Sequence, residues 1–87
     1  MTYRVEFTPA AARQVRKLSK VVQQRLRAAL DRLAEDPRPA GARALQGRPG
    51  RLRIRVGDHR VIYTVSDDVV LVLVLSVGHR RDVYRAP

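Results

Sequence analysis

The spacing of apolar residues predicts a strand and then a helix at the start of the chain. In residues 3–7 every second side chain is apolar, which is typical of a strand with one buried face. Thr8 and Pro9 form a helix start, because a threonine oxygen can cap free backbone N–H groups and proline fits the first helical position. We therefore expect a first helix over residues 10–18.

A longer helix is predicted from residue 20 to about residue 35, with Ser19 as its cap. Its apolar residues are spaced three and four apart and form one stripe, made of Val22, Leu26, Ala29, Leu30 and Leu33. The prolines within residues 36–39 end this helix. The two helices are expected to form a hairpin that packs on a sheet.

Residues 37–51 predict a surface connection, because they contain three prolines and three glycines, with Leu45 as the only large apolar residue. The chain then reads as strands over residues 52–56, 60–65 and 69–77, separated by turn residues. The last of these strands is apolar on both sides, so it should lie centrally in the sheet.

Together these patterns predict an α+β fold in one domain, residues 1–87. The N-terminal strand and a three-stranded antiparallel meander form one four-stranded sheet, and the helical hairpin packs on one face of it. A length of 87 residues fits one compact domain and no more.

The charge balance indicates an anionic partner. Lys and Arg number 18 against 8 Asp and Glu, a formal net charge of +10. A small domain with such a field attracts nucleic acid, an anionic membrane or an acidic protein. Only Lys17 and Lys20 are lysines, and a GC-rich genome would also favour arginine over lysine. Codon bias does not explain the scarcity of acids, so this argument depends on net charge alone.

The sequence predicts a soluble cytoplasmic protein with no membrane association. It has no cysteine, which excludes disulfides and thiolate metal sites and fits a reducing compartment. The start of the chain lacks the apolar segment of a signal peptide. The longest apolar run, residues 69–75, is far shorter than the roughly 18 to 20 residues of a membrane helix.

Most catalytic patterns are absent from the sequence. We find no paired carboxylates, phosphate-binding glycine loop, metal-ligand spacing or nucleophilic triad, and so expect no metal and no cofactor. The remaining candidate site residues are mostly basic. Arg53 and Arg55 are two apart in a strand and share a face, and Arg60 follows just across a tight turn.

The long strand runs antiparallel to its neighbour, so its end returns toward Arg60. Arg80, Arg81 and Tyr84 follow that end, and could join the strand arginines in one basic patch. Clustered cations are costly without an anion between them. The alternative is an ordinary solvated strand face on which carboxylates pair locally with the arginines.

Several short motifs occur in one order along almost the whole chain: residues 44–47 (ALQG), 52–56 (LRIRV), 57–63 (GDHRVIY) and 76–80 (SVGHR). With the predicted elements they resemble the RelE/ParE superfamily of bacterial toxins, most closely its RelE branch. The resemblance implies a ribosome-dependent endoribonuclease that cuts messenger RNA in the A site through attack by the 2′-hydroxyl.

The resemblance also implies roles for individual residues. Arg53 and Arg55 match two basic strand residues of the family, and Arg60 would grip the scissile phosphate. Arg80 would act on the phosphate or the leaving oxygen, and Tyr84 would stack on or orient the nucleotide. The basic residues expected to contact RNA along this surface are Arg51, Arg53, Arg55, Arg81 and Arg85.

One departure concerns acid–base chemistry. Well-studied relatives carry lysines where this chain has Arg53 and Arg55, and arginine does not lose its proton in proteins. His79 is a possible acid or base, or else a polar residue that closes the strand. His59 is expected to flank the turn, and Tyr63 to be a core residue.

Two other functions stay open at this point: a ParE-type inhibitor of DNA gyrase on the same fold, and a catalytically weak homologue that only binds its antitoxin. The expected partners are an acidic RelB-type antitoxin, the ribosome and messenger RNA. Operator DNA would be bound through the antitoxin, which could lie against the helical hairpin or displace the segment around Tyr84.

Overall fold

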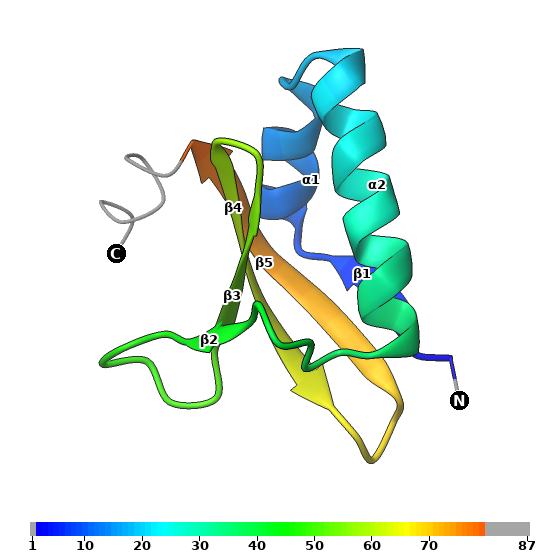
Figure 1. Cartoon of the computed structure of the whole chain (residues 1–87), viewed down its shortest axis with the longest axis vertical. Coiled ribbons are helices and arrows are strands. Elements are labelled where there is room, and N and C mark those ends of the chain that lie inside the picture. The colour runs from blue at the N-terminus through cyan, green and yellow to red at the C-terminus, as the bar shows by residue number, and fades with distance from the viewer. Residues whose placement is uncertain (1, 80–87) are drawn as a thin grey trace.

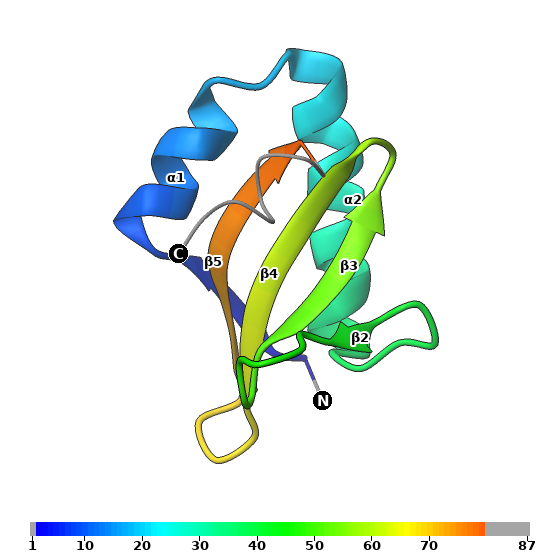
Figure 2. The same cartoon turned by 90° about the vertical axis from the view of Figure 1, so that its left-hand side faces the viewer.

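Two helices pack on one face of a five-stranded sheet in the computed structural model, which describes residues 2–79. The elements are β1 (Arg4–Phe7), α1 (Pro9–Arg16), α2 (Lys20–Glu35), β2 (Arg43–Ala44), β3 (Leu52–Val56), β4 (His59–Ser66) and β5 (Leu71–His79). The strand order is β1-β5-β4-β3-β2, with β1 parallel to β5 and every other pair antiparallel. Figure 1 shows both helices on one side of the sheet, and Figure 2 looks onto the opposite side, here called the far face.

Both helix starts form as the sequence predicts. The Thr8 hydroxyl accepts a hydrogen bond from the backbone N–H of Ala11 at 3.2 Å. The Ser19 hydroxyl accepts one from the backbone N–H of Val22 at 3.3 Å. Each cap satisfies one N–H that has no partner inside its helix. Neither helix has the length and apolar character needed to span a bilayer, within residues 2–79.

The first helix ends at Arg16, slightly before the expected end of residues 10–18. The side-chain amide of Gln23 donates to the carbonyl oxygens of Val15 and Leu18, at 2.9 and 3.0 Å. These bonds add a side-chain donor to carbonyl groups at the end of α1, where the regular helical bonds stop. A polar side chain of α2 therefore closes α1 and fixes the angle of the hairpin.

The core lies between the helices and the sheet. Its sheet side is formed by buried residues of the three central strands, namely Ile54, Val61, Tyr63, Val72, Val74 and Val77. The helices contribute Ala11, Leu26, Ala29, Leu30 and Leu33. β5 lies between β1 and β4, which confirms the central position predicted from its apolar composition.

The predicted α+β class is correct, but the predicted sheet of four strands is wrong by one strand. β2 lies within residues 37–51, which the sequence predicted to be a connection. Its two residues are paired with Leu52 and Arg53 of β3. Two residues cannot show an alternating pattern, so the sequence carries no signal for this strand.

β5 also begins at Leu71 rather than at residue 69. The backbone N–H of Val70 donates to the carbonyl of Asp67 at 3.3 Å, and Val70 has a φ of 54°. A β-branched residue rarely adopts this left-handed conformation, which turns the chain just before β5. Val69 is 62% exposed in the turn instead of lying in the strand.

Three segments that are distant in the sequence meet at the end of the sheet where β4 turns into β5. The Tyr3 hydroxyl donates to Asp67 at 2.7 Å, and the Arg38 guanidinium donates to both carboxylate oxygens of Asp67 at 3.1 and 3.0 Å. The hydrogen bonds from Arg38 and then from Tyr3 lower the pKa of Asp67. This exposed cluster ties the β4–β5 turn to the N-terminus and to the segment after α2.

Tyr63 is a core residue, as the sequence predicts. Its side chain is 0% exposed, and its hydroxyl donates to the carbonyl oxygen of Pro37 at 2.8 Å. Burial raises the pKa of Tyr63 to about 12, so the phenol stays protonated near neutral pH. The hydrogen bond anchors the chain where it leaves α2.

We predict that Tyr63→Phe lowers the free energy of unfolding by about 1 to 2 kcal/mol, because it leaves a buried carbonyl without its donor. Urea denaturation measures the loss. Tyr3→Phe is the matched control, since its hydroxyl bonds to an exposed carboxylate. Equal effects of the two substitutions would contradict the assigned role of the Tyr63 hydroxyl.

Candidate nucleic-acid interface

Three of the predicted site residues share the far face of the sheet. Ile54 points into the core, so its strand neighbours Arg53 and Arg55 project to the other side. Arg55 is the register partner of Arg60, and Arg53 that of Ile62. Residues directly opposite in an antiparallel pair have Cβ atoms about 5 Å apart. The tight turn after β3 thus brings these arginines together.

The three arginines differ in how freely they move. Arg60 keeps only 6% of its surface accessible, so its side chain is packed among its neighbours. Arg53 is half-buried and Arg55 is exposed. The site therefore combines one packed arginine with two whose side chains are more accessible to solvent.

A fourth arginine belongs to this surface, and the sequence analysis missed it. Arg43 of β2 is the register partner of Arg53. Its Nη1 donates to the carbonyl oxygens of Ala40 and Ala42, at 2.9 and 3.2 Å. Those bonds tie the guanidinium to the backbone just before β2. No sequence signal could place Arg43 here, because β2 itself was not predictable.

The arrangement sets like charges directly opposite one another in two strand pairs, Arg43 with Arg53 and Arg55 with Arg60. Such pairs destabilise a sheet. The two salt bridges within residues 2–79 are Arg4–Glu6 and Arg38–Asp67, and neither neutralises Arg43, Arg53 or Arg55. A polyanion is therefore the ligand that this surface suits best.

His79 lies at the same end of the sheet but not on the same face. It pairs in register with His59, and the two rings meet edge to face with their centroids 6.1 Å apart. Val61 and Val77, the preceding partners on that side, are buried against the helices. By strand alternation both histidines lie on the helix side, whereas Arg60 lies on the far face.

The remaining predicted residues flank this surface or lie beyond it. Arg51 immediately precedes β3, and its carbonyl oxygen accepts from the backbone N–H of Leu45 at 2.8 Å. The other predicted site residues, Arg80, Arg81, Tyr84 and Arg85, lie outside the described residues. Among residues 2–79 no three His, Cys, Asp or Glu side chains gather in a way that could hold a metal ion.

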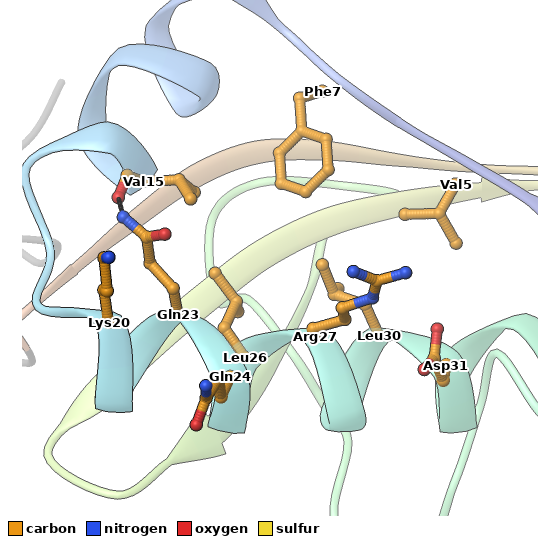
Figure 3. A pocket seen from close by; sticks show the side chains of 10 residues that line it. All are labelled: Val5, Phe7, Val15, Lys20, Gln23, Gln24, Leu26, Arg27, Leu30 and Asp31. Atoms are coloured by element: carbon orange, nitrogen blue, oxygen red, sulfur yellow. Dashed lines mark hydrogen bonds between the residues drawn. The ribbon is translucent and has the colours of Figure 1, made fainter.

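A second surface, between β1 and α2, was not found from the sequence. It is a groove of about 540 Å³, shown in Figure 3. Apolar side chains form much of its wall, namely Val5, Phe7, Val15, Leu26 and Leu30. Lys20, Arg27 and Asp31 also line it. β1 is an edge strand, so the groove runs beside backbone groups that can pair with another chain.

Comparison with known proteins gives consistent matches over nearly the whole chain. Residues 5–84 match the family model described as "ParE toxin of type II toxin-antitoxin system, parDE". The "mRNA interferase toxin RelE" of Escherichia coli K12 is 35% identical over 83 residues, which cover 93% of this chain and 86% of the relative. "Toxin RelG" of Mycobacterium tuberculosis is 31% identical over 86 residues, covering 98% of this chain and 99% of the relative.

Solved structures show the same similarity. A mutant of E. coli toxin RelE in the free state has a TM-score of 0.82 at 32% identity, covering 98% of this chain and 93% of that one. The RelE of an archaeal RelE–RelB complex from Pyrococcus horikoshii has a TM-score of 0.79 at 29% identity, covering 92% and 97%.

The facing arginines lead to a prediction about stability. We expect Arg55→Gln to raise the free energy of unfolding by about 0.5 kcal/mol at low ionic strength, because it relieves repulsion with Arg60. The gain should shrink in about 1 M salt, which screens exposed charges. Arg48→Gln, in the loop before β3, is the control. Urea titrations that show the same salt response for both variants would refute the repulsion.

Proposed function

This chain belongs to the RelE/ParE superfamily of type II toxins, in its RelE branch, and from that premise we propose that it is a ribosome-dependent endoribonuclease. Its substrate is messenger RNA in the ribosomal A site, and cleavage stops translation. The relatives named mRNA interferases support the reaction class. The observation that carries the proposal is the register that sets Arg53, Arg55 and Arg60 on one face of the sheet.

The proposed reaction is an in-line transesterification. The 2′-hydroxyl of the message attacks the adjacent phosphorus, an O2′–P bond forms, and the P–O5′ bond breaks. The products are a 2′,3′-cyclic phosphate and a 5′-hydroxyl. The proton of the attacking hydroxyl leaves with a base, and the departing oxygen gains one from an acid. Preorganised guanidinium groups neutralise the charge on the pentavalent intermediate, so the reaction needs no metal and no cofactor.

Arg60 is suited to hold the scissile phosphate, because a side chain packed among its neighbours loses little conformational freedom on binding. Arg53 and Arg55 then contact the RNA backbone on either side. We propose that Arg80 acts on the phosphate or the leaving oxygen and that Tyr84 stacks on the nucleotide. Arg51, Arg81 and Arg85 extend the backbone contacts.

Proton transfer needs a group other than these arginines, which stay protonated. Imidazole exchanges protons near neutral pH, and His79 ends the strand that pairs with β4 at Arg60. His79 is therefore our candidate for the acid or the base. Because it lies on the helix side, it would act around the end of the sheet rather than across its face.

We propose an acidic RelB-type antitoxin as the resident partner, with the groove between β1 and α2 as one of its docking sites. The solved neighbours include RelE–RelB complexes from three sources, which supports such a partner. An amphipathic antitoxin segment would place apolar side chains in the groove and acidic ones near Lys20 and Arg27. The pair acts in the cytoplasm and binds operator DNA through the antitoxin.

We predict that the chain cuts messages at A-site codons in a reconstituted translation reaction, read by primer extension. Arg60→Ala should lower the cleavage rate by roughly 100-fold or more, the usual cost of losing one preorganised donor. Arg48→Ala serves as the control. Inhibited gyrase supercoiling without cuts would indicate the ParE-type function instead. Antitoxin binding without either activity would indicate a catalytically weak homologue.

The groove gives a separate prediction. Phe7 is 38% exposed on its wall, so Phe7→Glu should weaken antitoxin binding by about 10-fold or more without unfolding the chain. Val21→Glu is the matched control, because Val21 is 58% exposed on α2 but does not line the groove. Calorimetry with the proposed acidic antitoxin measures the binding affinity of both variants. Equal losses would place the antitoxin elsewhere.

A further inference from the structure

A second cleft lies at the opposite edge of the sheet from the groove, between α2 and β3. Its volume is about 260 Å³. β2 pairs with Leu52 and Arg53, and among residues 2–79 no strand pairs with the rest of the outer edge of β3. Arg32 of α2 and Arg55 of β3 line the cleft, together with apolar residues and one glycine. Figure 2 shows β3 passing in front of α2 at this edge.

Arg25 extends the same basic surface toward the β3–β4 turn. Its Nη1 lies 4.0 Å from the position that a Cβ atom would take at Gly57. Gly57 has a φ of +59°, which suits glycine at the tip of a tight turn. Arg25 and Arg32 are two helical turns apart on α2 with Ala29 between them, so all three share the side that faces β3.

These cations have no partner within residues 2–79: no hydrogen bond or salt bridge there involves the side chains of Arg25, Arg32 or Arg55. Two acids near the end of α2 bond to other groups. Glu35, three residues after Arg32 on the same helix, accepts from the Thr2 hydroxyl at 3.2 Å, and Asp36 accepts from the backbone N–H of Arg38 at 3.3 Å. The basic surface of the far face thus continues around the β3 edge onto α2 through Arg55, which belongs to both.

We infer that this edge, formed by Arg25, Arg32 and Arg55, binds a stretch of phosphodiester backbone beyond the phosphate that is cut. The inference deepens the proposed function and rests on it. Two guanidinium groups on α2 and one on β3 make a track for successive phosphates, and the apolar floor of the cleft offers nothing to read base edges. The track adds affinity and orientation without sequence preference.

The backbone could come from the cleaved strand itself or from structured ribosomal RNA. The test uses the full chain with two probes: a single-stranded RNA of about 16 nucleotides bearing a 2′-O-methyl group at the cut position, and isolated small ribosomal subunits. Each contacted phosphate contributes about 0.7 to the slope of log affinity against log salt for a single strand.

Arg25→Ala combined with Arg32→Ala should flatten that slope by about 1.4 with the probe that supplies the backbone. The control is Arg13→Ala combined with Arg16→Ala, which removes the same charge from α1. A change with the single strand assigns the track to the cleaved message, and a change only with subunits assigns it to ribosomal RNA. Equal slopes for both double variants, with both probes, would overturn the inference.

Primer extension keeps the two proposals apart. If the parent chain binds both probes but never cuts, the proposed nuclease activity is wrong. The phosphate track is then tested by the salt dependence of binding of the two double variants. A parent chain that cuts, with slopes unaffected by the α2 substitutions, would overturn the track alone. A parent chain that binds neither RNA would overturn both.

Discussion

The sheet holds positive charges together against their mutual repulsion. Backbone hydrogen bonds set Arg55 opposite Arg60 and Arg43 opposite Arg53, which is an unfavourable arrangement for an empty surface. The repulsion between these arginines is offset on the other side of the sheet, where the helices bury apolar residues such as Val61 and Tyr63. The far face, which carries the arginines, is suited to a polyanion, and the apolar core on the helix side stabilises the sheet that holds them.

The two edges of the sheet offer different chemistry to partners. At the β1 edge, an apolar groove lies beside a strand that has one neighbour in the sheet formed by residues 2–79. An amphipathic peptide could bind in such a groove. At the β3 edge, Arg32 and Arg55 line a smaller cleft and have no hydrogen bond or salt bridge within residues 2–79, which suits them to phosphate groups. α2 forms one wall of each, with Arg27 facing the first and Arg32 the second. In these proposals one helix would contact the antitoxin on one side and RNA on the other.

An arginine-rich site also shapes the chemistry. Guanidinium groups position and neutralise phosphate but do not exchange protons, so proton transfer must come from elsewhere. The described residues place two histidines at the end of the sheet, in contact with each other and on the opposite side from Arg60. Charge stabilisation and proton transfer would then come from different faces, brought together where β4 and β5 end.

Local patterns in the sequence determined the helices, the main strands and the shared face of Arg53 and Arg55. Capping residues, apolar spacing and strand alternation depend on neighbours within a few positions, so they can be read from the chain directly. The class of fold and the central place of β5 follow from the same information. The resemblance to a toxin family rests on motifs within these elements.

Only the tertiary structure shows that residues 43–44 form strand β2 and that Arg43 lies opposite Arg53, because a two-residue strand exists only through its pairing with a neighbour. It also decided the side of the sheet on which His79 lies. Simple alternation from Val72 and Val74 would put His79 on the far face, but the register shifts between Tyr63–Val74 and Ile62–Ser76 and reverses the parity. The groove and the cleft likewise join residues far apart in sequence. Such pairings depend on packing across the whole molecule, which no local pattern contains.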